Sequence, residues 1–190
     1  MKRGQVRIIG GKWRGRKLSI AETVEIRPTP DRVRETLFNW LMTIVPGARC
    51  LDLFTGSGAL GVEALSRGAS HAVLVDQSPA VVKLLKEELA VFGADNVDVF
   101  QAKMPTSWSF LSQTAVKAFD LVFLDPPYRD NLLLPLCFML EEKKLLADSA
   151  YIYLETDKVL ENTELPPGWE IIKYKKAGLV GYYLVKRTGV

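Results

Sequence analysis

From residue 49 onward, short apolar segments alternate with helical ones, and this alternation constrains the fold more than any other feature. The spacing predicts buried strands, with amphipathic or Leu-rich helices between most of them, over residues 49–53, 72–76, 97–100, 119–124 and 150–155. Parallel strands need a crossover, usually a helix, so the pattern predicts a mostly parallel sheet with helices on both faces. Two late segments, 169–175 and 179–186, predict an antiparallel hairpin that completes seven strands and closes one edge.

The first 28 residues follow a different pattern, in which basic and apolar positions alternate around Gly10-Gly11 and Gly15. This predicts short strands joined by tight turns, so we expect a basic β-hairpin extension over residues 1–28 and a main domain over residues 29–190. A helix should begin near residues 28–31, with Thr29 or Asp31 as its N-cap, and end at Pro46-Gly47.

Positive charge is concentrated at the N-terminal end of the chain. Residues 1–34 carry ten Lys and Arg against three acidic residues, so this segment contributes +7 to a net charge of +3 and the remaining residues contribute −4. Such a distribution indicates contact with a polyanion. The alternative is a solvated basic tail, but the interleaved apolar residues favour a folded hairpin with a basic face.

A glycine-rich turn follows the first strand of the alternation. Gly56, Gly58 and Gly61 have the G-x-G-x-x-G spacing between a predicted strand and a predicted helix, which suits close approach of a nucleotide to the backbone. Asp76, at the end of the next strand, is positioned to accept hydrogen bonds from both hydroxyls of a ribose. Asp52 would repel a pyrophosphate but suits an amino group and a sulfonium, which favours S-adenosylmethionine over a dinucleotide. Alternatively, Asp52 is a structural aspartate of the turn.

The second motif, Asp125-Pro126-Pro127-Tyr128, follows a buried strand at the carboxyl end of the predicted sheet, where such sheets bind ligands. An exocyclic amine on a base is a poor nucleophile. A carboxylate and a rigidly held backbone carbonyl that accept its two N–H groups would direct its lone pair at a methyl group. Tyr128 could stack on the base. These four residues are therefore the catalytic candidates, and the chemistry requires no metal.

Together, these residues resemble the class I S-adenosylmethionine-dependent methyltransferases with a Rossmann-like fold, specifically the bacterial 16S rRNA guanine-N2 methyltransferases of the RsmD type. The resemblance is carried by residues 7–18, 27–41, 51–68 and 125–128. It implies transfer of a methyl group to N2 of one guanine, guanine 966 in the family's naming, in the 16S rRNA of an assembling or assembled 30S subunit. The product of the cofactor would be S-adenosylhomocysteine.

The resemblance also assigns roles by position. Cofactor binding falls to Asp52, Phe54, Thr55, Gly56, Ser57, Gly58, Asp76 and Gln77, with Thr29 and Arg32 near the methionine end. RNA binding falls to Arg7, Lys12, Trp13, Arg14, Arg16 and Lys17. One departure is visible. Family members often have an acidic or amide residue near the adenine amino group, where this chain has Gln101-Ala102-Lys103, so Gln101 or the nearby backbone would take that place.

Three other functions compete with this interpretation. A DNA adenine-N6 methyltransferase uses the same Asp-Pro-Pro-Tyr chemistry but usually carries a target-recognition insertion, for which this chain has no room. A dinucleotide-dependent oxidoreductase leaves that motif unexplained. A non-catalytic RNA-binding assembly factor would bind RNA without methyl transfer.

The remaining composition sets broad limits. No apolar run approaches the roughly 20 residues that span a bilayer, and no apolar segment follows the basic start, so we expect a cytoplasmic protein without a membrane contact. Cys50 and Cys137 have apolar neighbours and read as buried thiols, and the single His71 argues against a His-rich metal site. We expect a monomer.

Overall fold

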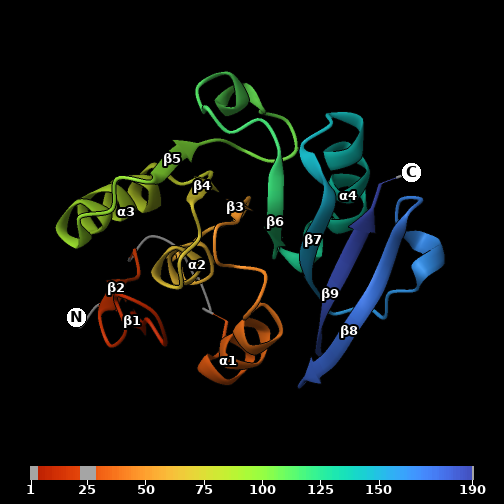
Figure 1. The fold of residues 1–190 in the computed structure, drawn as a ribbon, viewed down its shortest axis with the longest axis horizontal. Coiled ribbons are helices and arrows are strands. Elements are labelled where there is room, and N and C mark those ends of the chain that lie inside the picture. Colours follow the sequence, from red (N-terminus) through yellow and green to blue (C-terminus); the bar gives the residue numbers. More distant parts are fainter. Residues whose placement is uncertain (1–3, 22–28, 190) are drawn as a thin grey trace.

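The computed structural model describes residues 4–21 and 29–189 of the chain, so residues 1–3 and 22–28 of the predicted extension lie outside the described part. One sheet of seven strands, in the order β5-β4-β3-β6-β7-β9-β8, forms its centre (Figure 1). The strands are β3 (Arg49–Asp52), β4 (His71–Asp76), β5 (Val97–Gln101), β6 (Phe119–Leu124), β7 (Leu146–Thr156), β8 (Trp169–Ala177) and β9 (Val180–Thr188). The predicted α/β fold and its seven strands are confirmed.

Strand β3 lies at the centre of the parallel part of the sheet, where Cys50 pairs with Ala72 of β4 and with Leu121 of β6. The chain then builds outward in both directions, to β5 on one side and to β7 on the other. The order therefore reverses between β3 and β6. In open α/β sheets this is the point at which ligands bind, at the carboxyl ends of the strands.

The late hairpin closes the sheet as predicted, with one refinement of its geometry. Strand β9 pairs antiparallel with both β7 and β8. The strand that runs against the parallel five is therefore β9, one position in from the edge, and β8 is the edge strand itself. The turn between β8 and β9 lies at the same end of the sheet as the carboxyl ends of β6 and β7.

Helices cover both faces because the strands are apolar on both sides. On one face of the sheet, strand side chains such as Leu74 and Phe123 pack with α1 (Asp31–Trp40), α2 (Gly61–Ser66) and α3 (Pro79–Phe92). On the other face, the alternating side chains of the same strands pack with α4 (Leu133–Glu142) and with the 3₁₀ turn Ser109–Ser112. The ends of α3 follow from its sequence: the Ser78 hydroxyl accepts a hydrogen bond from the Val81 N–H, and Gly93 ends the helix at φ +65°.

Helix α1 differs from the prediction at both ends. Its N-cap is Pro30, with no side-chain capping bond, rather than Thr29 or Asp31. It ends at Trp40 rather than at Pro46, and the following residues continue as turns. Leu41 and Val45 are nevertheless buried in these turns. The apolar spacing therefore predicted correctly which residues are buried, but it predicted a longer helix than the structure has.

The predicted N-terminal hairpin is present as β1 (Gln5–Arg7) paired antiparallel with β2 (Lys17–Ser19). It lies beside α2 on the face covered by α1, α2 and α3 (Figure 1). Ile8, Trp13 and Leu18 are buried in the same apolar core as those helices. The division into an extension and a main domain stays a prediction. No helix among the described residues is both long and apolar enough to cross a membrane.

Candidate active site

A cavity of about 820 Å³ opens at the carboxyl ends of the central strands. This is within the range of roughly 300–1,000 Å³ typical of small-molecule sites. Both sequence motifs contribute to its lining. Among the predicted site residues, the cavity is lined by Thr29, Phe54, Gly56, Asp76, Gln77, Asp125, Pro126, Pro127 and Tyr128. The glycine-rich turn and the Asp125–Tyr128 motif, which lie far apart in the sequence, therefore line the same cavity.

The glycine-rich turn is tied to the end of β4. The N–H of Gly56 donates to Oδ2 of Asp76 at 3.0 Å, and Oδ1 of Asp76 accepts from the Ser78 N–H at 2.8 Å. Gly58 has φ +79°, and a Cβ there would lie 2.7 Å from the Leu85 side chain. Each oxygen of a carboxylate has two lone pairs and can accept a second hydrogen bond. Asp76 therefore keeps capacity for a ligand while it holds the turn.

Asp52 is buried behind this turn, with 4% of its surface exposed, and is not among the residues that line the cavity. Its Oδ2 accepts hydrogen bonds from the Thr55 hydroxyl and from the Gly61 N–H, both at 3.1 Å. Burial raises the pKa of Asp52 to about 7, although these hydrogen bonds favour the charged form. In this structure Asp52 organises the turn, and its predicted contact with the cofactor stays a prediction.

The other predicted cofactor residues surround the cavity without lining it. Thr55, Ser57 and Gly58 are buried within the turn, and Arg32 is exposed on α1. The Gln101 side chain donates to the Gln77 carbonyl at 3.3 Å. Next to it, Ala102, Lys103 and Met104 line the cavity instead. The sequence analysis offered Gln101 or the nearby backbone as the neighbour of the adenine amino group. The segment after Gln101 borders the cavity, and Gln101 itself does not.

The Asp125–Tyr128 motif meets an acidic residue that sequence analysis missed. Tyr128 donates from its hydroxyl to Oε1 of Glu155 at 3.1 Å, and Tyr153 donates to Oε2 of the same carboxylate at 2.8 Å. Glu155 comes from β7, is 7% exposed and lines the cavity. The signal that could have found it is an acidic residue near the end of a buried strand, as at Asp76 and Asp125.

Acidic groups dominate the electrostatics of this wall. Burial, together with the charges of Glu155 and Asp52, raises the pKa of Asp125. Burial also raises the pKa of Glu155, even though two phenols donate to its carboxylate. The pKa of the Tyr128 phenol is raised by burial and by both carboxylates, so it stays a donor. Such a wall suits cations and N–H donors and disfavours phosphates.

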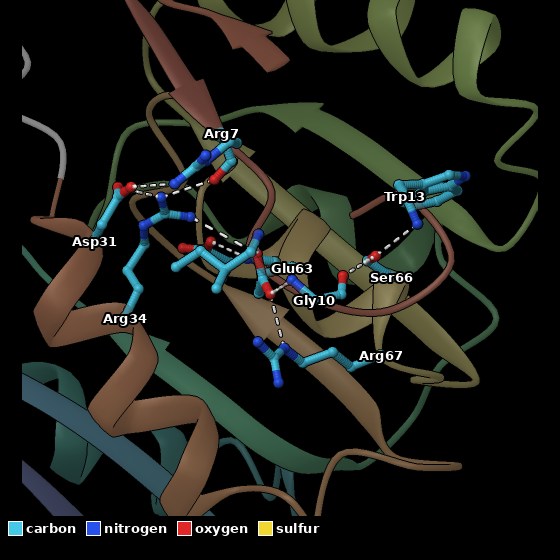
Figure 2. Close-up of polar contacts among 11 residues, drawn as sticks. Arg7, Gly10, Trp13, Asp31, Arg34, Glu63, Ser66 and Arg67 are labelled. Atoms are coloured by element: carbon cyan, nitrogen blue, oxygen red, sulfur yellow. Dashed lines mark hydrogen bonds and ion pairs between the residues drawn. The ribbon is translucent and has the colours of Figure 1, made fainter. Parts of the chain in front are cut away.

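The hairpin is fixed to the domain by the buried carboxylate of Glu63 on α2 (Figure 2). This carboxylate accepts hydrogen bonds from the N–H groups of Ile9 and Gly10, each at 2.8 Å, and from Nε of Arg67 at 2.7 Å. Gly11 lies so close to α2 that a Cβ would be 1.8 Å from the Ser66 carbonyl oxygen. Only glycine fits that contact at its φ of +76°.

Helix α1 joins the same network through Arg34, whose side chain is fully buried. The Arg34 guanidinium donates to the Arg7 carbonyl at 2.8 Å and to Asp31 at 2.7 Å, and its Nη1 lies 3.7 Å from Oε2 of Glu63 (Figure 2). The hairpin is thus linked to α1, which begins next to the cavity residues Thr29 and Pro30, and to α2.

The six predicted RNA-binding residues divide into two groups. Trp13 is 6% exposed and packs on Phe92, with ring centroids 5.3 Å apart. Arg16 lies over the same ring and donates to the Val91 carbonyl at 3.2 Å. Both side chains hold the hairpin on α3. The others are exposed, namely Arg7, Lys12, Arg14 and Lys17.

Comparison with known proteins places the chain in a family. A profile of the family described as Conserved hypothetical protein 95 matches residues 6–186. The chain is 46% identical over 184 residues to the Ribosomal RNA small subunit methyltransferase D of Escherichia coli strain K12, which covers 97% of this chain and 91% of that protein. The chain belongs to the RsmD-type methyltransferases.

Two further relatives extend this RsmD-type likeness. The protein of the same name from Haemophilus influenzae is 42% identical over 185 residues, covering 96% of this chain and 94% of its own. A solved structure described as a putative methyltransferase yhhF from Escherichia coli superposes with a TM-score of 0.84 at 44% identity, over 98% of this chain and all of that one. The motifs quoted from the sequence therefore lie within a match that spans nearly the whole chain.

Proposed function

We propose that this RsmD-type chain transfers a methyl group from S-adenosylmethionine to the N2 amino group of one guanine in 16S rRNA. The observation that carries the proposal is the shared cavity, which Gly56, Asp76 and Asp125–Tyr128 all line. The relatives' printed name, Ribosomal RNA small subunit methyltransferase D, supports the choice of substrate. By the same resemblance, the target would be guanine 966 in a 30S subunit, methylated in the cytoplasm by a monomer.

The cavity fits the cofactor on chemical grounds. The Asp76 carboxylate would accept hydrogen bonds from the ribose hydroxyls, and the segment from Ala102 to Met104 would border the adenine. Thr29 would lie near the methionine end, where acidic groups favour its amino group and sulfonium. When bound, S-adenosylmethionine supplies the methyl group.

The Asp125–Tyr128 motif would position the target amine. The Asp125 carboxylate would accept one N–H of N2, and the backbone carbonyl before Pro127, held by the fixed φ of the prolines, would accept the other. Tyr128 would stack on the flipped base, which offsets part of the cost of unstacking it. The N–CH₃ bond would form as the methyl–sulfonium bond of the cofactor breaks, which leaves S-adenosylhomocysteine. The nitrogen, cationic on transfer, would lose one proton to Asp125 or to water. The protein's contribution is positioning and electrostatics, and no metal is needed.

The hairpin would contact RNA through its exposed cations Arg7, Lys12, Arg14 and Lys17. A transfer assay tests methyl transfer to 16S rRNA. Small subunits from cells that lack this methyltransferase are incubated with the chain and with S-adenosylmethionine labelled in its methyl group. We expect label in 16S rRNA. Labelling of DNA alone, or of no substrate, would overturn the proposal.

A further inference from the structure

Glu155 stands beside Asp125 at the carboxyl ends of two neighbouring strands. In the parallel pair of β6 and β7, Leu124 is in register with Leu154, so Asp125 and Glu155 come next on the two chains. Both line the cavity. Residues in register on adjacent strands direct their side chains to the same side. The proposed function assigns no role to Glu155.

Both oxygens of the Glu155 carboxylate bind phenols, and the two phenols have different surroundings. Tyr153 is fully buried and packs edge-on against Phe123, with ring centroids 6.4 Å apart. Tyr128 is only half-buried and lies at the cavity, where the chain leaves the sheet through Pro126 and Pro127. The Glu155 carboxylate therefore connects Tyr153, which is fixed in the core, to Tyr128, which lines the cavity.

Stability alone does not account for an acid at this position. Glu155 is 7% exposed, and both of its carboxylate oxygens accept hydrogen bonds from phenols, which are neutral donors. Burial of a carboxylate costs free energy, which a neutral or apolar side chain would not incur. Groups kept at such a cost are concentrated at functional sites.

We propose that Glu155 is a positioning residue for methyl transfer: its carboxylate fixes the Tyr128 ring through the phenol and holds negative charge beside Asp125. This inference rests on the proposed function. The Tyr128 ring, which would stack on the target base, is then held at two points. Its backbone is fixed by the turn after Pro127, and its hydroxyl is fixed by the hydrogen bond to Glu155. A Tyr128 ring free to rotate would present the base to Asp125 over a range of orientations, most of them unproductive.

The second part of this role concerns charge. Asp125 faces Glu155 and Tyr153 of β7, Tyr128 of its own motif and Asp52 at the end of β3. The charge of Glu155 adds to burial in raising the pKa of Asp125. If ionised Asp125 accepts the amine N–H, activity is lost as the pH falls through that pKa. Removal of the Glu155 charge must then move the acid limb of the rate profile to lower pH.

The experiment compares Glu155→Gln with wild type, with Glu170→Gln as a matched control on the exposed edge strand β8. Methyl transfer to small subunits gives kcat and KM across pH, and cofactor binding and thermal unfolding are measured in parallel. We expect Glu155→Gln to lower kcat roughly ten- to a hundredfold, the size of a hydrogen bond to a charged group. Its acid limb should lie at lower pH, its cofactor affinity should match wild type, and Glu170→Gln should change none of these.

A second variant keeps the test decisive if Glu155→Gln does not fold. Tyr128→Phe keeps the ring but removes the phenol that Glu155 binds, so it should lower kcat by a similar factor. Where both single variants fold, the double variant should be little worse than either one. Full activity in Tyr128→Phe, or an unshifted pH profile in folded Glu155→Gln, would overturn the positioning role. A wild-type chain that transfers no methyl group would instead overturn the proposed function.

Discussion

The buried guanidinium of Arg34 lies 3.7 Å from the buried carboxylate of Glu63, and each also binds the backbone of the N-terminal hairpin. A charge pair with no exposed surface is expensive to desolvate, and its partners must both be present. Its position links the hairpin to the helix that begins at the cavity. The hairpin, with its exposed cations, is thus attached to α1 and α2 through polar contacts as well as through apolar packing.

Loss of Glu63 should be among the most destabilising single changes in the chain. Glu63→Ala leaves Arg34 without its buried partner and leaves the N–H groups of Ile9 and Gly10 without an acceptor. We expect the free energy of unfolding to fall by about 3–5 kcal/mol, as measured in urea. The control is Glu87→Ala, whose side chain is exposed on α3 and should cost less than about 1 kcal/mol. Equal losses in the two variants would argue against the network.

The exposed cations of the hairpin should control RNA affinity through salt. Replacement of Arg14 and Lys17 by alanine should weaken binding to small subunits and reduce the slope of log affinity against log salt by up to about 2. The matched control replaces Lys117 and Lys143, which are exposed near the amino ends of β6 and β7, away from the cavity. An identical slope in both double variants would remove the hairpin from the RNA interface.

The raised pKa of Asp52 predicts a pH-dependent effect on stability. Burial raises this pKa from 3.8 to about 7, so between these values the folded state binds a proton that the unfolded state has lost. The contribution of Asp52 to the free energy of unfolding therefore decreases as the pH rises through that window and is lowest above pH 7. Asp52→Asn keeps an oxygen for Thr55 and Gly61 but cannot ionise.

Thermal unfolding of the cofactor-free protein measures this effect. The Tm of Asp52→Asn relative to wild type should increase by several degrees from pH 5 to pH 8. The charge of Asp52 also contributes to the raised pKa of Asp125, so its removal lowers that pKa and changes the Tm difference in the same direction. A Tm difference that stays constant with pH would mean that Asp52 is ionised throughout.

Much of the fold was predictable from the sequence because parallel strands buried on both faces are nearly continuously apolar, as in residues 119–124, where Asp120 is the one polar residue. The anchoring of the hairpin was not. Every residue of the six-residue helix α2 is buried, so no polar face marks Glu63 as unusual. Arg34 likewise lies in a run of charges near the N-terminal end of the chain, where nothing in the pattern separates a buried arginine from a solvated one.

The candidate site was predictable where an acidic residue joins a motif. Asp76 and Asp125 both line the cavity, and the sequence marks both of them. Asp76 ends the strand that follows the glycine-rich turn, and Asp125 follows a strand and begins the Asp-Pro-Pro-Tyr motif. Glu155 lacks such a turn, and its role depends on register with β6, which sequence alone does not supply. A charge run also cannot distinguish Arg16, which is bound to α3, from Arg14, which is exposed.

Methylation of a guanine amino group leaves a chemically distinct nucleoside, which can be identified in the product. Small subunits that lack the modification are treated with the chain and S-adenosylmethionine, and the 16S rRNA is digested to nucleosides for mass spectrometry. We expect N2-methylguanosine with the wild-type chain. With Asp125→Ala we expect none, while cofactor affinity stays nearly intact. N6-methyladenosine as the product, or undiminished N2-methylguanosine with Asp125→Ala, would contradict the proposed function.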